Sequence, residues 1–366
     1  MEHLPKRTSL VQETAATLKE WISAGILKES LPGERELKAR LGIGRNTLRL
    51  ALDFLEKEGW LSSASHGQQR RVQKAEPLVP GDSGASFRLP VTFLSPYSPV
   101  ESETLVELED LRMRLEEQGR RLQFLSPAIF RLQHPDHHLE RMVRQHPSAA
   151  WVLHMASEPM QRWFARQNVR AFIYGSPFPG VDLPFLVPDW EGAAFHAGIQ
   201  LARQGHRNIG ILEYQERFPG VLATERGLQR ALDTTGAPGR VVAFKDDLTP
   251  SSVAHSLDVA FSLKKRPTAM VLTRSNQLLT CLSWCGSRGL RFPGDFSLVS
   301  LTHDTWFGEF HPPITHYSTK PAMVARYLAE KVMELVATGH VARQSLRLQL
   351  EYVPGATIGP APRAGR

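Results

Sequence analysis

The side chains best placed for chemistry near the N-terminus are Arg45, Asn46 and Arg49, at the start of a predicted helix. They lie off the apolar positions of that helix, so they face solvent. Basic residues at a helix N-terminus oppose the helix dipole, and a phosphate or guanine at that end relieves the cost. The pattern favours contact with DNA. The alternative is a small helical domain with ordinary surface arginines.

Other constellations point to no catalytic or metal chemistry. The run HPDHH at 134–138 has histidines three and four apart, but no Cys or Glu set completes a metal site, and a loop-to-helix start explains it. No Ser/His/Asp order and no Gly-rich phosphate loop stand out, so neither an enzyme nor a cofactor is expected. Cys281 and Cys285 share one side of a helix and are predicted to be packed thiols in a reducing cytoplasm.

The composition suits a chain of several lobes with a polyanionic partner. The 366 residues exceed one ordinary core, and 42% of them are hydrophobic. The net charge of +7 fits nucleic acid, although many basic proteins bind none. Residues 1–10 hold no apolar signal core, and no apolar run reaches about 18 residues, so a cytoplasmic protein without a membrane span is expected.

Three predicted helices position the basic cluster. The first carries one apolar stripe, the second covers 34–41, and Gly42-Ile43-Gly44 makes the short turn before the third, which begins near Arg45. Trp60-Leu61 and Arg71-Val72 are predicted to pair as a hairpin around residues 65–69, a wing. The apolar stripes of the first and third helices consist of Val11, Ala15, Leu18, Ile22, Leu48, Ala51, Leu52 and Leu55.

The stretch LPGERELKARLGIGRNTLRLALDFLEKEGWL (31–61) resembles the winged helix-turn-helix of the GntR family, and the likeness runs over about residues 8–72. Gly33 and Gly44 stand where the family has serines; glycine is a tolerable N-cap, but a phosphate contact is lost with each hydroxyl. The wing, SHGQQRR, also departs from the family pattern. The resemblance implies DNA contacts from Arg35, Arg45, Asn46, Thr47 and Arg49, and from the wing residues Gly67, Gln68, Arg70 and Arg71.

A Pro-, Gly- and Ser-rich linker at 75–90 separates this domain, residues 1–74, from a larger one. Beyond it, short apolar runs alternate with amphipathic helices, which predicts βαβ units and doubly wound parallel sheets. A charged helix is expected over 105–122. The predicted strands are 91–94, 123–125, 149–153, 171–174, 209–212, 241–244, 269–272 and 298–301.

The larger domain, residues 91–353, resembles the LacI/GalR sensor domain, which is related to periplasmic sugar-binding proteins. The likeness is carried by 188–212, 223–232, 266–279 and 289–320. It implies two α/β lobes with a cleft between them. Lobe 1 is expected at 91–205 and 316–340 and lobe 2 at 206–315 and 346–353, with crossings near Gly205, Thr315 and 345 and a tail at 354–366.

By this resemblance, Asp189 and Arg226 match ligand-binding residues of the sensor family. A carboxylate accepting two hydroxyls and a forked guanidinium suit polyol recognition. Each residue also has an ordinary explanation: Asp189 as the N-cap of the following helix, and Arg226 as a surface side chain.

Other positions depart from the family and add positive charge to the expected cleft. The family's Asn-Asp pair is Arg274-Ser275 here, and its Asp-Asp pair falls on Thr302-His303, with Asp304 one place on. Trp190 and Trp306 flank these positions; each suits either stacking on a sugar or core packing.

These patterns together predict a regulator, expected to be a repressor, whose homodimer binds a palindromic DNA operator. Its small-molecule effector is expected to be a neutral sugar, a sugar acid or a sugar phosphate. Two alternatives stay open. One is a sugar-binding or sugar-processing protein without gene regulation, and the other is a DNA-binding regulator whose altered sensor binds no ligand.

Overall fold

The computed structural model describes residues 14, 15, 18, 22, 31–41, 44–57, 60–62, 70, 72, 89–96, 105–236, 238–247, 249–342 and 345–362. The chain divides into two units, Met1–Ser86 and Phe87–Arg366. No helix among these residues is long and apolar enough to cross a membrane.

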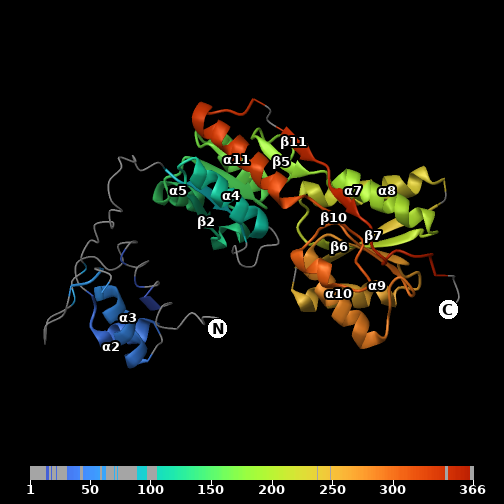
Figure 1. Ribbon diagram of the computed structural model, residues 1–366, viewed down its shortest axis with the longest axis horizontal. Helices are drawn as coiled ribbons and strands as arrows, with labels where there is room; N and C mark the ends of the chain where they lie inside the picture. The colour runs from blue at the N-terminus through green and yellow to red at the C-terminus, as the bar shows by residue number, and fades with distance from the viewer. Residues whose placement is uncertain are drawn as a thin grey trace. The chain divides into compact units, whose positions relative to one another are not determined.

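Among the described residues of the first unit, α2 (Glu34–Leu41) and α3 (Arg45–Lys57) lie where the second and third predicted helices are expected (Figure 1). Acidic residues in the first turn of α2 suit the helix dipole, whereas the first turn of α3 has none. Leu61 and Val72 form an antiparallel bridge at the base of the predicted hairpin. The expected wing tip, 65–69, and Val11 lie outside the described residues. The core of this unit comprises Ala15, Leu18, Leu31, Leu37, Leu48, Ala51, Leu52, Leu55 and Leu61.

Lobe 1 of the second unit is a parallel sheet in the order β11-β5-β4-β3-β1-β2. Helices α4 and α11 cover one face, and α5 and α6 cover the other. The strands are β1 (Val91–Leu94), β2 (Leu122–Leu125), β3 (Ala150–His154), β4 (Ala171–Tyr174), β5 (Phe185–Pro188) and β11 (Ser345–Leu348). The helices are α4 (Leu105–Glu117), α5 (Asp136–Gln145), α6 (Glu158–Arg166) and α11 (Pro321–Thr338).

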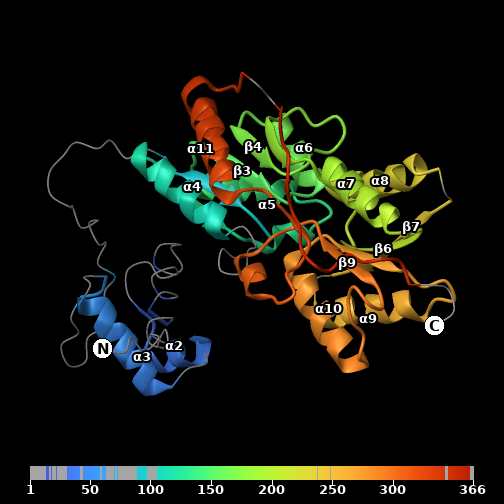
Figure 2. The same cartoon turned by 45° about the vertical axis from the view of Figure 1, so that its right-hand side comes forward.

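Lobe 2 repeats this three-layer arrangement, with the order β12-β10-β9-β8-β6-β7 and only β12 antiparallel within the described sheet. Figure 2 shows α7 and α8 on one side of this sheet and α9 and α10 on the other. The strands are β6 (Asn208–Tyr214), β7 (Arg240–Asp246), β8 (Ala269–Leu272), β9 (Ser297–Ser300), β10 (His316–Ser318) and β12 (Glu351–Val353). The helices are α7 (Trp190–Arg203), α8 (Pro219–Thr234), α9 (Pro250–Ser262) and α10 (Ser275–Arg288).

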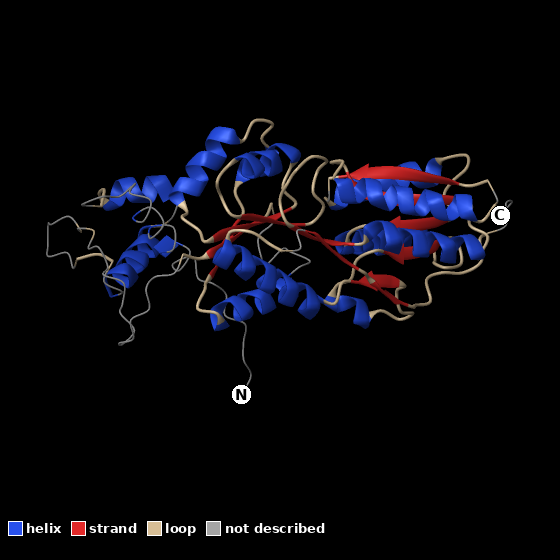
Figure 3. Ribbon diagram, turned by 90° about the horizontal axis from the view of Figure 1, so that it is seen from above, coloured by secondary structure: helices blue, strands red, loops and turns tan. Residues whose placement is uncertain are grey.

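The two-lobed α/β fold is as predicted, with helices on both faces of each sheet (Figure 3). The helix expected over 105–122 is shorter: it ends at Glu117, Gly119 takes a left-handed φ of 71°, and Leu122 begins β2. Leu122 pairs with Val91 in the parallel sheet. The amphipathic pattern therefore extends past the end of the helix into the turn and the start of the strand.

The crossings between lobes differ from those expected. Helix α7 was assigned to lobe 1, but it packs into the lobe 2 core, so the first crossing lies near Asp189 rather than Gly205. Strand β10, expected in lobe 1, pairs with β9 and β12 in lobe 2. In the last segment, β11 belongs to lobe 1 and β12 to lobe 2. Two of the crossing segments touch, because the Asp189 amide donates to the Leu348 carbonyl at 2.7 Å.

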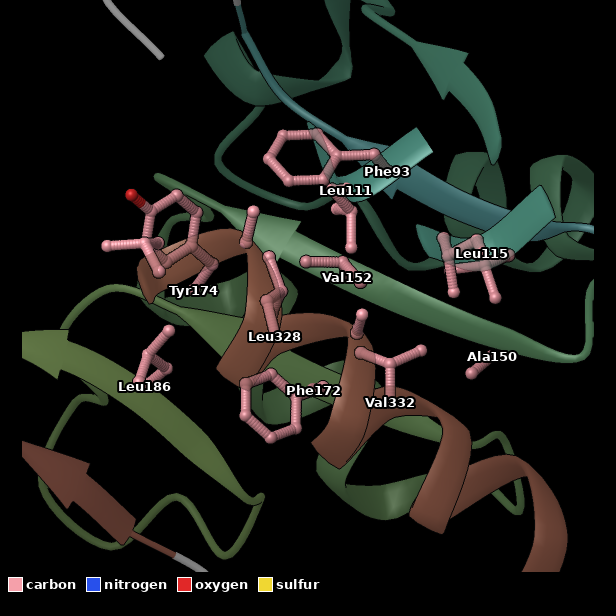
Figure 4. Packing of buried hydrophobic residues seen from close by; sticks show 14 of the residues in the cluster. Phe93, Leu111, Leu115, Ala150, Val152, Phe172, Tyr174, Leu186, Leu328 and Val332 are labelled. Carbon is pink, nitrogen blue, oxygen red and sulfur yellow. The ribbon is translucent and has the colours of Figure 1, made fainter. Parts of the chain in front are cut away.

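The lobe 1 core fixes the carboxyl ends of its strands. Buried side chains of β1, β3 and β4 meet those of α4 and α11 in one cluster (Figure 4). Tyr174 is the last residue of β4 and the one polar member of this cluster, with its hydroxyl at the edge. The parallel strands therefore deliver their final residues, His154 and Tyr174, to the same end of the sheet.

Candidate functional site

The described part of α3 presents basic and apolar groups to solvent. Arg49 and Leu50 are exposed, and Thr47 is half-buried. Arg45 and Asn46 occupy the first turn of α3, and Arg35 that of α2. The helix therefore offers the N-terminal end that the sequence assigns to base recognition.

Arg70, expected to face DNA, lies among the carboxylates of its own unit. Its guanidinium bonds to Glu56, lies 3.2 Å from Glu34 and 3.7 Å from Asp53, and has only 17% of its side chain exposed. Three carboxylates neutralise this guanidinium, so it attracts a DNA phosphate only weakly. The structure therefore gives Arg70 a role in joining α2 and α3. Arg71, Gly67 and Gln68 lie outside the described residues.

A cavity of about 200 Å³ opens between the lobes at the carboxyl ends of both sheets. This is where doubly wound sheets place ligand sites. Three of the eight predicted ligand residues line it: Trp190 at the start of α7, Arg274 before α10, and His303 after β9. Its other lining residues include Glu107, His154, Met155, Gln161, Tyr174, Ser176, Tyr214, Phe218, Gly220, Thr273, Tyr317 and Thr319.

The other predicted ligand residues are not among those lining the cavity. Asp189 caps α7, since its carboxylate accepts from the Gly192 amide at 3.1 Å. Arg226 points to solvent with 60% of its side chain exposed, 3.2 Å from Glu191.

Three further predicted residues serve the local fold of lobe 2. Ser275 is buried, and its hydroxyl donates to Asp304 at 3.1 Å. Asp304 also accepts from the Thr305 amide at the start of a 3₁₀ turn. Trp306 packs against the lobe 2 core, which was the alternative to stacking on a ligand.

A carboxylate forms the polar wall of the cavity on the lobe 1 side. Glu107 of α4 is buried and accepts a short hydrogen bond from the Tyr174 hydroxyl and one of 2.9 Å from the Thr319 hydroxyl. Burial and the Glu107 charge raise the pKa of Tyr174, so this hydroxyl stays a donor. Thr319 lies directly between β10 and α11, so the bond ties a crossing segment to the cavity wall.

Two histidines of the cavity are held neutral. Burial, with the positive charge of Arg274, lowers the pKa of His154 to about 3, and the Ser95 hydroxyl lies 3.0 Å from its Nδ1. Burial and the neighbouring His316 lower the pKa of His303, whose ring stacks on His316 at a centroid distance of 4.9 Å. Near neutral pH, the histidines of the site are thus hydrogen-bonding groups rather than charges.

Comparison with known proteins assigns both units. Residues 10–68 match the bacterial regulatory proteins of the gntR family, and residues 199–358 match the periplasmic binding protein-like domain. The arabinose metabolism transcriptional repressor of Geobacillus stearothermophilus is 27% identical over 317 residues, which cover 83% of each chain. The chain is a transcription regulator with a gntR-type DNA-binding domain and a periplasmic-binding-protein-like domain.

Other relatives and solved structures match part of the regulator. The transcriptional repressor PurR of Aliivibrio salmonicida is 24% identical over 48% of this chain and 58% of its own length. A LacI family regulator from Bifidobacterium animalis subsp. lactis has a TM-score of 0.61 at 20% identity, covering 75% of this chain and 98% of that one. One from Enterococcus faecium, with bound ribose, has a TM-score of 0.62 at 14% identity over 74% and 99%. These structures show the LacI-type fold.

The family motifs did not predict several of the residues that line the cavity of the regulator. His154, Tyr174 and Thr273 each end or follow a strand, so the rule that ligands bind at carboxyl ends of strands could have found them. Nothing in the sequence marks Glu107 as a cavity residue, because it is one of several acidic residues on the same helix. Among the described residues, no group of three or more His, Cys, Asp or Glu could hold a metal.

Proposed function

We propose that this regulator is a ligand-controlled repressor that binds a palindromic operator as a homodimer, in the cytoplasm, with a sugar or sugar derivative as effector. The observation that carries the proposal is the cavity at the carboxyl ends of both sheets, lined from both lobes, in a chain that also has a gntR domain. One winged domain reads only a few base pairs, so two linked readers give useful specificity.

The proposed DNA contacts lie on the helix-turn-helix and the wing. Arg45, Asn46 and Arg49 read base edges from the N-terminal end of α3, and Arg35 and Thr47 position the domain on phosphates. Gly67, Gln68 and Arg71 extend the contact from the wing. Arg70 supports the domain from within.

The proposed effector contacts are those of the cavity wall. Trp190, Arg274 and His303 keep the role predicted for them, and Glu107 and His154 join them from lobe 1. A ligand bound to both lobes stabilises the closed arrangement, and the crossing segments act as the hinge. Such coupling is worth about 1–3 kcal/mol and must be reciprocal. No catalytic step is part of the proposal.

The test measures linkage directly. Operator affinity is measured by fluorescence anisotropy with and without saturating candidate effector, and effector affinity by calorimetry with and without operator. The names of the compared proteins put arabinose and ribose among the first probes. The proposal predicts the same factor in both directions. Binding of a probe with no change in operator affinity contradicts control by that probe. Operator binding with no effector response across sugars, sugar acids and sugar phosphates favours a sensor that binds no ligand.

A further inference from the structure

The guanidinium of Arg274 lies in the cavity wall without an ion-pair partner among the described residues. It is only partly exposed, yet no carboxylate there lies within 4.0 Å of it. Two more exposed arginines of the same lobe are paired: Arg226 with Glu191, and Arg288 with Asp258. Partial burial of an unpaired charge is costly, so this cation is poised for an anionic partner.

The groups nearest to Arg274 do not neutralise it. One of its terminal nitrogens contacts the Met155 sulfur at 2.7 Å, and a thioether is only a weak acceptor. The neighbouring His154 is neutral, because burial and this same guanidinium lower its pKa. The contact with lobe 1 is therefore one that a better acceptor can displace.

The one carboxylate among the lining residues is already engaged. Glu107 accepts hydrogen bonds from Tyr174 and Thr319 in lobe 1. Asp304 lies near the start of α10 but is bonded to Ser275 and to the Thr305 amide. The amino-terminal end of α8 adds a partial positive charge where Gly220 lines the cavity. The lobe 2 wall thus carries net positive character.

We propose that the effector is a polyhydroxylated molecule bearing an anionic group, either a sugar acid or a sugar phosphate, and that Arg274 binds this group. The inference rests on the proposed function and specifies its ligand. Trp190, Tyr214 and Phe218 give the flat apolar walls against which a sugar ring stacks. A carboxylate or phosphate matches the two-pronged donor of a guanidinium, and Arg274 then joins the lobes through the ligand.

The competing role for Arg274 is a strut between lobes. In that role, its contact with Met155 holds the cleft closed and the effector is neutral. The two roles differ in what substitution does. Loss of an anion receptor removes the preference for acidic ligands only, whereas loss of a strut changes the affinity for charged and neutral ligands alike.

The experiment compares matched ligands by calorimetry on the full chain. The pairs are D-glucose with D-glucuronate, L-arabinose with L-arabinonate, and D-ribose with D-ribose 5-phosphate. In at least one pair, the acidic member is expected to bind the wild type about tenfold or more tightly than its neutral partner. Arg274→Gln removes that preference, Arg274→Lys keeps part of it, and the exposed control Arg226→Gln leaves it unchanged. Circular dichroism verifies that each variant is folded.

The inference is overturned if no acidic member binds more tightly than its partner, or if the preference survives Arg274→Gln. Equal weakening of the acidic and the neutral member by Arg274→Gln assigns the strut role and also overturns it. A neutral sugar that binds and shifts operator affinity leaves the ligand-controlled regulator standing while this inference fails, so the two failures are distinguishable.

Discussion

The rings of Phe178 and Phe218, one from each lobe, lie with their centroids 6.0 Å apart, and Phe218 also lines the cavity. Phe218 caps α8 in lobe 2, and its ring also stacks on Tyr214. Nearby, a Cβ added at Gly220 would lie 3.1 Å from the Ser176 hydroxyl of lobe 1. The lobes therefore touch beside the cavity, whose lining includes Phe218, Ser176 and Gly220.

We expect this aromatic pair to stabilise the closed arrangement of the lobes. Phe178→Ala and Phe218→Ala remove the same contact, so their effects on unfolding free energy should be non-additive by about 0.5–1.5 kcal/mol. Urea unfolding of the two single variants and the double variant measures this coupling. Phe178→Ala combined with Phe261→Ala, in the opposite layer of lobe 2, is the additive control. A coupling energy of zero for the first pair means that the rings do not meet in solution.

The buried carboxyl of Glu213 is expected to make the protein less stable above neutral pH. Burial, reinforced by the Glu225 carboxylate, raises its pKa to about 8, while Lys245 and Arg217 oppose the shift. A glutamate in an unfolded chain titrates near pH 4.3, so the folded state holds this proton more tightly. The stability it contributes is fully present below about pH 4.3 and is lost as the pH rises through about 8.

The titration of His154 changes the stability of the fold in a different pH range from that of Glu213, so the two contributions can be measured separately. His154, with its pKa lowered to about 3, destabilises the fold only as the pH falls below about 6.5. Between about pH 6.5 and 9, Glu213→Gln should therefore flatten the decline and raise the unfolding free energy at pH 8.5 by about 1–3 kcal/mol. Urea unfolding across this range tests it, with the exposed Glu216→Gln as control. An unchanged slope in Glu213→Gln would show that this carboxyl is not the source.

Two helical glycines should respond in opposite directions to the same substitution. A Cβ at Gly227 of α8 would lie 2.4 Å from the Glu191 carbonyl of α7, so Gly227→Ala is expected to destabilise by about 1–3 kcal/mol or more. A Cβ at Gly286 of α10 would meet no atom within 4 Å, so Gly286→Ala should stabilise by about 0.5–1 kcal/mol. Thermal unfolding of both variants decides it, and destabilisation by Gly286→Ala would contradict the packing seen at α10.

Periodicity and motif order predicted most of the fold because local patterns decide local elements. Buried parallel strands such as β4 and β8 are continuous apolar runs, so the sequence predicts where they begin and end. The assignment of α7 to a lobe could not be obtained in this way. Its alanine-rich face suits either core, and only the close approach to α8 at Gly198 and Gly227 places it in lobe 2.

The cavity was predicted in position but only partly in composition. Arg274 and His303 lie in the loops that follow β8 and β9, which end at Leu272 and Ser300, so their place in the chain determined their exposure to the cleft. Asp189 and Arg226 were expected from motif matches, but a motif does not specify where a side chain points: one caps a helix and the other turns to solvent. Glu107 depends on a tertiary contact with Thr319, more than two hundred residues away.

The two arginines Arg49 and Arg70 should separate DNA recognition from domain stability. Arg49 is exposed on α3, so Arg49→Ala is expected to lower operator affinity by about 1–3 kcal/mol, with less effect on random DNA and no loss of stability. Arg70→Ala leaves the carboxylates of Glu34, Asp53 and Glu56 without their shared cation, so it should destabilise the first unit by about 1–3 kcal/mol.

Fluorescence anisotropy at several salt concentrations, together with thermal unfolding, distinguishes these outcomes. Arg71→Ala, at the predicted wing, serves as the reference for a phosphate contact: it should weaken all sequences alike and reduce the salt slope by about 1. If Arg70→Ala behaves like Arg71→Ala and leaves the melting temperature unchanged, the ion pairs of Arg70 are dispensable and its side chain meets DNA instead. If Arg49→Ala lowers specific and random affinity equally, the assignment of α3 as the recognition helix fails.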